Sequence, residues 1–240
     1  AVSDITVDAL GNCIVHLKGK GFQGEGALYQ TLSSHIVLGT LFLEDDAWIG
    51  KKDYSSISTQ YRYKYIEFNG HELHVSSNAY FSTVGLSFRV GAESKLIVES
   101  GARWGVSGAL SLSSTSANLL PVEFADASIL EVGATSAAIP ADVIVPEGAS
   151  SMIYINGVTS STAADSLIGG TVLVDGKLSV AFAKNSYSCK VATAIRGGGT
   201  FEISGGCLTI GESDHRFRTL RFGTRNNVLG SLALPKDYVL

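Results

Sequence analysis

The sequence feature that most constrains the fold is a short apolar segment that recurs along the chain, each time after a corner of small or polar residues. Six of these segments end at Val75, Val98, Val132, Ile155, Val180 and Ile210. Apolar residues alternate with others inside each segment, and a period of two places one set of side chains on one face of a β-strand. Corners such as Asn69-Gly70 and Gly205-Gly206 supply the positive φ angles that tight turns need. The pattern predicts an all-β chain of short strands and turns.

The spacing of these segments predicts how the strands are arranged. Their last residues are separated by steps of 23, 34, 23, 25 and 30 residues, about 27 on average. A strand-and-turn unit of this length cannot bury its own apolar face, so such units stack on one another as a solenoid. The other all-β fold to consider is a β-sandwich, which would also show turn signals about every 8 to 12 residues, so short-range spacing does not separate the two folds. The longer recurrence favours a right-handed parallel β-helix of about nine coils.

A β-helix predicts the placement of two sets of residues. The first is that alternate residues of the recurring segments point inward, and these are Leu73, Val75, Leu96, Val98, Leu178, Val180, Leu208 and Ile210. The second is that residues 1–10 cap an end, because an open coil would expose a row of unpaired backbone groups.

Composition supports a folded chain and excludes some partners. The 240 residues are 45% hydrophobic and 17% charged, which is enough to bury a sizeable core and is unlike a disordered chain. We expect residues 1–240 to form one β-helical domain. The net charge is −4 and the 18 lysines and arginines are scattered, so we expect no nucleic-acid partner. No window approaches the roughly 18 uncharged apolar residues of a membrane helix, so we expect no membrane insertion of this segment.

Several runs of the sequence resemble a known repeat. Residues 17–29, 39–50 and 68–73 are similar to the passenger-associated β-strand repeat of bacterial autotransporter-type surface proteins, and residues 169–178 and 198–208 are a looser echo. The resemblance implies a secreted or cell-surface right-handed β-helix that forms part of a long stalk. It carries over no catalytic residues, because the motif is a folding repeat.

The C-terminal end points in the same direction. Residues 233–240 read as the start of another strand. We therefore expect this chain to be a fragment of a longer surface protein.

Polar motifs that could suggest chemistry each have a structural explanation. Asp45 and Asp46 could suggest the paired acids of a glycosidase, but adjacent strand residues point apart, so a solvated corner is expected. His71 and His74 are three residues apart, which would place them on opposite sides of a strand around the core residue between them, and not in a shared metal site. Residues 197–199 are three glycines without the lysine or helix of a phosphate-binding loop, so we expect a corner where backbone approaches backbone. We expect no enzyme activity, no cofactor and no metal.

The three cysteines allow one possible disulfide. Cys189 lies 18 residues before Cys207, close to one coil, so neighbouring coils could bring the two together. We expect Cys13 to stay unpaired. A bond between the other two and a pair of free thiols both stay open.

A basic run at residues 215–222 has two interpretations. It could bind a polyanion such as an acidic glycan, or it could be a solvated strand face whose arginine stems cover the coil below. The alternation breaks between Arg218 and Leu220, which indicates a β-bulge.

Three tyrosines are the candidate binding residues. If Ile66 and Phe68 face the core, strand parity turns Tyr61, Tyr63 and Tyr65 outward. Aromatic faces stack on the C–H surfaces of sugars and the phenol hydroxyls form hydrogen bonds, so the row could bind a glycan. The alternative is that these rings only pack over the neighbouring coil.

Two functions follow from these observations. The first is a non-catalytic extracellular β-helical stalk or display module that acts in adhesion or interaction. The alternative is a carbohydrate-binding β-helix domain attached or related to a polysaccharide-degrading enzyme. In both cases the expected partners are host or environmental glycans.

Overall fold

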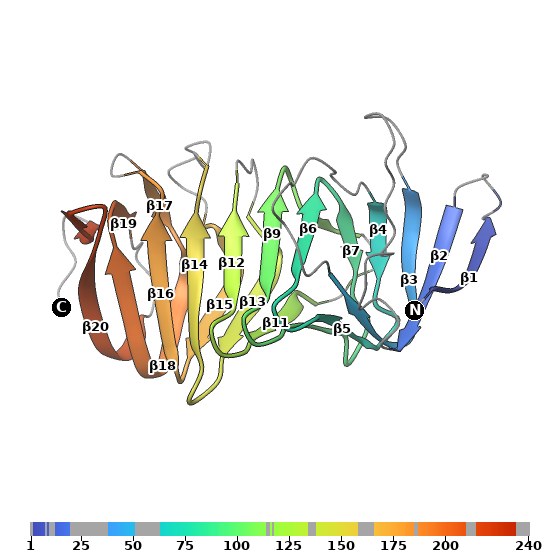
Figure 1. The fold of residues 1–240 in the computed structure, drawn as a ribbon, viewed down its shortest axis with the longest axis horizontal. Coiled ribbons are helices and arrows are strands. Elements are labelled where there is room, and N and C mark those ends of the chain that lie inside the picture. The colour runs from blue at the N-terminus through green and yellow to red at the C-terminus, as the bar shows by residue number, and fades with distance from the viewer. Residues whose placement is uncertain are drawn as a thin grey trace.

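The chain winds into a stack of coils that are made of β-strands (Figure 1). The computed structural model describes residues 2–7, 9, 13–19, 38–50, 63–113, 116, 118–133, 138–157, 166–184, 187–209 and 215–233. Every regular element in these ranges is a strand, and nearly all strand pairs are parallel. The prediction of an all-β chain with stacked parallel strands, a β-solenoid, is confirmed. Right-handed winding stays a prediction from the general rule for parallel crossovers.

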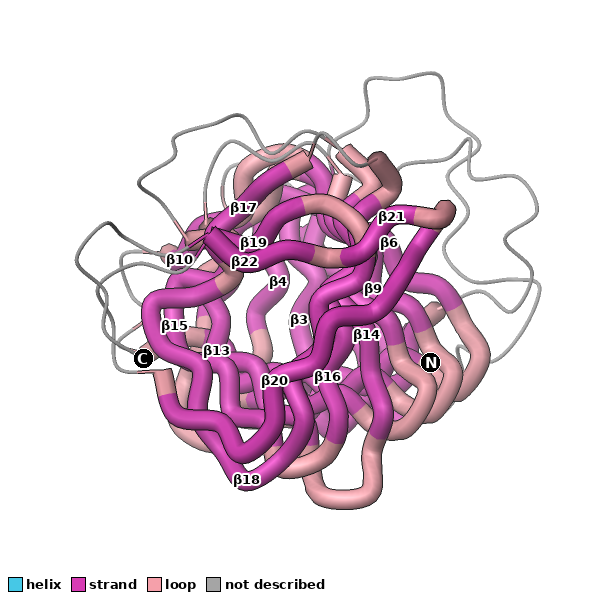
Figure 2. Tube along the Cα trace, turned by 90° about the vertical axis from the view of Figure 1, so that its left-hand side faces the viewer, coloured by secondary structure: helices cyan, strands magenta, loops and turns pink. Residues whose placement is uncertain are grey.

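The coils have three faces that surround one interior (Figure 2). The first face carries β2 (Cys13–Gly19), the start of β3 (Leu38–Ile49), β4 (Tyr63–Glu67), β7 (Ser87–Arg89) and β10 (Ser111–Leu112). The second face carries the end of β3, then β5 (Glu72–Val75), β8 (Lys95–Val98), β11 (Leu120–Phe124), β13 (Ala141–Val145), β15 (Ile168–Val174) and the start of β18 (Ala192–Ser204). The third face carries β6 (Tyr80–Val84), β9 (Arg103–Ser107), β12 (Ile129–Val132), β14 (Ser150–Ile155), β16 (Lys177–Phe182), the end of β18 and the end of β20 (Arg216–Arg225). The start of β20 pairs with the start of β18 on the second face. A small separate sheet contains β17 (Ser188–Lys190), β19 (Cys207–Thr209) and β22 (Ser231–Ala233).

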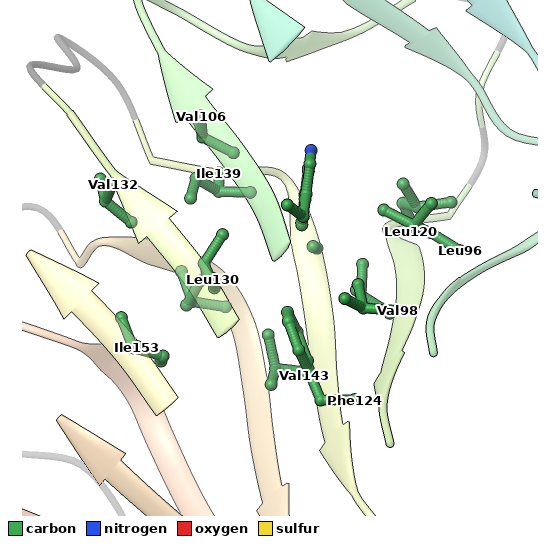
Figure 3. Packing of buried hydrophobic residues seen from close by; sticks show 14 of the residues in the cluster. Leu96, Val98, Val106, Leu120, Phe124, Leu130, Val132, Ile139, Val143 and Ile153 are labelled. Carbon is green, nitrogen blue, oxygen red and sulfur yellow. The ribbon is translucent and has the colours of Figure 1, made fainter. Parts of the chain in front are cut away.

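The interior is filled by apolar side chains that stack on the residue one coil away. On the second face, Leu73 is in register with Leu96, and Leu96 with Val122. On the third face, Leu130 is in register with Ile153. Figure 3 shows part of this packing. Seven of the residues expected to point inward are buried, namely Leu73, Val75, Leu96, Val98, Leu178, Val180 and Leu208, and Ile210 lies outside the described residues.

Corner residues supply the turns and also join one coil to the next. Asn69 and Gly70 have φ angles of 51° and 81°, as the Asn-Gly corner predicts. Aspartates near the corners accept hydrogen bonds from the backbone of the following coil. Asp46 Oδ1 accepts from the Glu72 amide at 2.9 Å. Asp126 Oδ1 accepts in the same way from the amide of Ser150, 24 residues further along the chain. These side chains therefore fix the coil-to-coil register.

The number of coils is smaller than the number that the spacing of the segments predicted. The described strands form about seven turns instead of nine. Val98 and Val132, the pair behind the long step of 34, are not partners: Val98 pairs with Phe124 and Val132 pairs with Val106. That step passes from the second face to the third. The average spacing of 27 was therefore not the length of one coil.

The two ends of the stack differ from its middle. At the N-terminal end β1 (Val2–Val7) pairs antiparallel with β2, so residues of the expected cap do cover the edge of the first coil. Its side chains Ile5 and Val7 are still 57% and 65% exposed. At the C-terminal end β21 (Val228–Leu229) pairs antiparallel with the end of β20.

The basic run forms most of β20, and a register shift is present near the predicted position, but the extra residue lies in β18 and not in the basic run. The register with β18 shifts where Arg218 faces both Gly198 and Gly199. After the shift Leu220 pairs with Phe201 and takes its inward direction, while Arg216, Arg218 and Arg221 are exposed. The polyanion alternative for this run stays a prediction.

The glycine run at 197–199 is a place where backbone approaches backbone, as expected. A Cβ atom at Gly199 would lie 2.0 Å from the carbonyl oxygen of Gly176, in the coil below. A Cβ atom at Gly198 would meet nothing closer than 4.0 Å. The run lies inside β18 and not in a separate turn.

Candidate functional site

Tyr65 points outward from β4, as strand parity predicts. Ile66 and Phe68 are fully buried, and Tyr65 is half-buried on the opposite side. Tyr61 and the side chain of Tyr63 lie outside the described residues, so the expected row of three rings is placed only at Tyr65.

Two rows of outward side chains cross the first face at this point. In one row Tyr65 is in register with Thr40 of β3 and Ser87 of β7. In the other row, the partners across four parallel strands are His16, Phe42, Glu67 and Arg89. Residues from four different coils therefore meet on one outer surface.

A hollow of about 270 Å³ lies between these rows, and we name it the groove. Thr40, only 8% exposed, lines it and is in register with the larger Ile14 and Tyr65 on the neighbouring strands. The groove is lined by Ile14, His16, Gly39, Thr40, Phe42, Lys64, Tyr65, Glu67 and Arg89. Its volume lies just below the roughly 300 Å³ at which pockets for small molecules begin, and its walls combine rings with a few polar groups.

The charged groups of the groove are mostly held by partners. Arg89 Nη1 donates to Glu67 Oε2 at 2.8 Å, and its guanidinium carbon lies 4.0 Å from the centre of the Tyr65 ring. His16 lies between Thr6 Oγ1 at 2.8 Å and Glu44 Oε1 at 3.1 Å. These contacts orient the side chains before any ligand arrives.

A second hollow continues the groove along the coil. It has a volume of about 370 Å³ and shares Glu67 and Arg89 with the first. Its other walls are the corner residues Asn69, Gly70, Val90, Gly91 and Ala92. The two hollows together form an extended open surface with the Glu67–Arg89 pair between them.

Sequence reasoning missed most of this site. Phe42 stands between two leucines in an unbroken apolar run, and only parity, with Leu41 and Leu43 buried, indicates that its ring points outward. Glu67 and Arg89 are 22 residues apart, so their contact depends on the length of one coil.

One group of described residues has the donor set of a metal site. Single ligand atoms of Asp45, Asp46 and His71 lie within 4.8 Å of one another. The expectation that the two aspartates point apart is therefore wrong, because they lie where β3 bends from the first face to the second. Both also have structural contacts: Asp45 Oδ1 accepts from the Asp46 amide, and Asp46 Oδ1 accepts from the Glu72 amide.

His74 belongs to a different cluster, which joins three coils. Its ring stacks on Trp48 with centres 4.3 Å apart, and its nitrogens lie 3.1 Å from Glu72 and 3.2 Å from Glu99. The His74 side chain is only 14% exposed, so it is largely covered and is not the solvated surface histidine that was expected. His71 instead faces Asp46 at 3.8 Å, so the two histidines do not share a site.

Glu99 is the acceptor at the centre of this cluster. Trp48 Nε1 donates to Glu99 Oε1 at 2.7 Å, and the amide and hydroxyl of Ser77 donate to Oε2. Burial acts to raise the pKa of Glu99, but the hydrogen bonds from Ser77 and Trp48 and the charge of His74 outweigh it, so the pKa lies below its usual value. The cluster is a clamp between coils.

Cys189 and Cys207 are free thiols on neighbouring strands. Cys189 is in register with the buried Leu208, whereas Cys207 is in register with Ser188, so the thiols leave their strands on opposite faces. Burial, together with the nearby Cys207, raises the pKa of Cys189 to about 12. The side chain of Cys13 lies outside the described residues.

Comparison with known proteins found no family model, no curated protein and no solved structure that matches the chain. In the part of the chain that the structure describes, no helix is long and apolar enough to cross a membrane.

Proposed function

We propose that this chain is a non-catalytic β-helical stalk or display module of a secreted or cell-surface bacterial protein, and that it acts in adhesion by binding a glycan in the groove. The β-solenoid supports the first part, because it is the fold that the autotransporter-type repeat implies. The runs that resemble this repeat lie partly in β3, at the corner from β4 to β5, and in β15 to β19. Fold alone does not establish function, so the groove carries the second part.

The observation that supports glycan binding is the combination of side chains around Tyr65. The rings of Phe42 and Tyr65 offer apolar surface for the C–H face of a sugar. Glu67 and Arg89, fixed to each other at 2.8 Å, offer an acceptor and donors beside them for sugar hydroxyls. Because Arg89 covers part of Tyr65, a sugar would contact the part of the ring that Arg89 leaves open.

A glycan array tests this function. The parent protein should bind a subset of glycans, and Tyr65→Ala and Phe42→Ala should each weaken binding by about tenfold or more, as expected for loss of an aromatic contact of about 1 to 3 kcal/mol. Tyr154→Ala is the matched control, because Tyr154 also points outward and has Arg225 at 4.6 Å from its ring centre. Absence of binding, or equal loss in the control, would reject the groove.

The glycans that the protein binds on the array also test whether the chain is catalytic. Bound glycans incubated with the protein should release no new reducing ends. Release that disappears in an Asp45→Asn, Asp46→Asn double variant would contradict the non-catalytic role.

A further inference from the structure

We infer that the groove selects a glycan whose sugar unit next to Lys64 carries a carboxylate, such as a uronic acid. This inference rests on the proposed glycan binding and adds the class of sugar. It follows from the balance of charges around the Tyr65 ring.

The groove has one cation that no described carboxylate neutralises. Glu67 is held by Arg89, and His16 lies beside Glu44. Lys64 is exposed, and among the residues that the structure describes it forms no ion pair. A ligand in the groove therefore meets an ammonium group that has no carboxylate partner among the described residues.

The position of Lys64 brings this charge to the place where a sugar would stack. Its Nζ lies 5.4 Å from the centre of the Tyr65 ring, and the residue lines the hollow beside Gly39 and Thr40. A uronic acid whose sugar ring contacts Tyr65 would hold its carboxylate at the edge of that sugar ring. The flexible side chain of Lys64 could then bring its ammonium group to the carboxylate. An ammonium group forms charge-assisted hydrogen bonds with a carboxylate, and these are about twice as strong as neutral ones.

The second hollow indicates where the rest of the glycan lies. Beyond the Glu67–Arg89 pair its walls are the corner residues Asn69, Gly70, Val90, Gly91 and Ala92, with no further charged side chain. The geometry therefore suits an oligosaccharide with an acidic unit beside Lys64 and a unit bound through hydroxyl groups at the corner.

The test uses uronic-acid oligosaccharides, each printed beside its methyl ester, which removes the charge and keeps the sugar. The parent should bind the preferred acid about three- to tenfold more tightly than its ester, the range for one partly exposed ion pair. This preference should shrink as salt rises. Lys64→Gln should lower the affinity for the acid to that for the ester, so that the preference disappears.

Two controls make the result specific. Lys184→Gln should keep the preference, because Lys184 is also an exposed lysine near a tyrosine, 5.8 Å from the Tyr187 ring centre, but lies outside the groove. An Arg218→Gln, Arg221→Gln variant should also keep it. Loss of the preference in this last variant would move the acidic site to β20 and overturn the inference.

The remaining outcomes separate this inference from the proposed function. Equal binding of acid and ester by the parent would overturn the acidic unit and leave glycan binding in place. Absence of binding to any printed sugar would overturn both.

Discussion

Two tyrosine–arginine pairs on the outer surface have the same chemistry and different surroundings. Arg89 lies 4.0 Å from the ring centre of Tyr65, and Arg225 lies 4.6 Å from that of Tyr154. Tyr65 borders the groove, which its neighbour Thr40 also lines. Tyr154 is in register with Glu131 and Ala181 and borders neither of the two hollows. Both tyrosines therefore have an arginine and a small residue beside them, and only Tyr65 borders a hollow. The side chains that differ are the other outward residues that line the groove, namely Ile14, His16, Phe42, Lys64 and Glu67.

The arginines of the two pairs also differ, because Glu67 holds Arg89 at 2.8 Å, whereas Arg225 forms no ion pair with a described residue. Two cations of the later coils are matched by carboxylates one coil away, Arg103 by Glu131 at 2.9 Å and Lys177 by Glu202 at 2.9 Å. We name these pairs the ladder. In the groove Lys64 is left over. The ladder joins coils, whereas the groove offers contacts to something else, and this distinction can be tested.

The largest expected effect concerns the interior, which both regions share. Ile153 is buried between Leu130 and Val180, so Ile153→Ala should lower the free energy of unfolding by about 2 to 5 kcal/mol. Ile153→Val should cost about 0.5 to 1.5 kcal/mol. Denaturant unfolding measures both. At a temperature where the variants stay folded, glycan binding should match the parent, and a parallel loss of binding would mean that the groove depends on distant coils.

A smaller effect is expected where two coils touch through backbone. Gly199→Ala should cost about 1 to 3 kcal/mol, because its Cβ would overlap the carbonyl of Gly176, and Gly198→Ala should cost little. The difference in thermal melting between these neighbouring variants checks the register of β18. Equal effects would show that the glycines matter for chain flexibility and not for close approach.

The clamp around Glu99 should make stability depend on pH. A carboxyl group with a lowered pKa in the folded chain stabilises it above the ordinary pKa, and this stabilisation is lost as the pH falls through the folded value. Glu99 and Glu202 both have lowered pKa values, the latter mainly because Lys177 donates a hydrogen bond to it. Stability should therefore decline in acid, below about pH 4.5.

Glu99→Gln isolates this contribution. The variant should be less stable by about 1 kcal/mol at neutral pH, and its stability should fall less steeply in acid. Unfolding curves measured from pH 7 to pH 3 in both proteins give the comparison. Identical slopes would show that Glu99 does not contribute.

The smallest effect is expected for one pair of the ladder. Lys177→Gln should lower stability by about 0 to 1 kcal/mol, since the pair is partly exposed, and the loss should shrink in high salt. Glycan binding should not change. Weakened binding in this variant would remove the distinction between ladder and groove.

The fold could be predicted well because the interior follows a local rule. Alternation around Leu73 and Leu178 assigns inward residues without knowledge of their partners, and these residues are buried. The number of coils could not be predicted, because a recurring pattern does not reveal which face it belongs to, as Val98 and Val132 show.

The site was less predictable because it is made by contacts between coils. The outward direction of Tyr65 follows from its neighbours in sequence. The position of Phe42 beside Glu67, and of Glu67 beside Arg89, depends on the register of β3, β4 and β7. The meeting of Asp45 and Asp46 depends on the bend of one strand, which overrides the alternation expected for an extended segment.

The most direct test of the account is to locate the ligand. Backbone amide chemical shifts should be recorded while the protein is titrated with the tightest-binding oligosaccharide of the array. The account predicts saturable shifts at Phe42, Lys64, Tyr65 and Arg89, with little change at Tyr154 or along the ladder. Shifts that centre on Arg218 and Arg221 of β20, or on Tyr154, would contradict it.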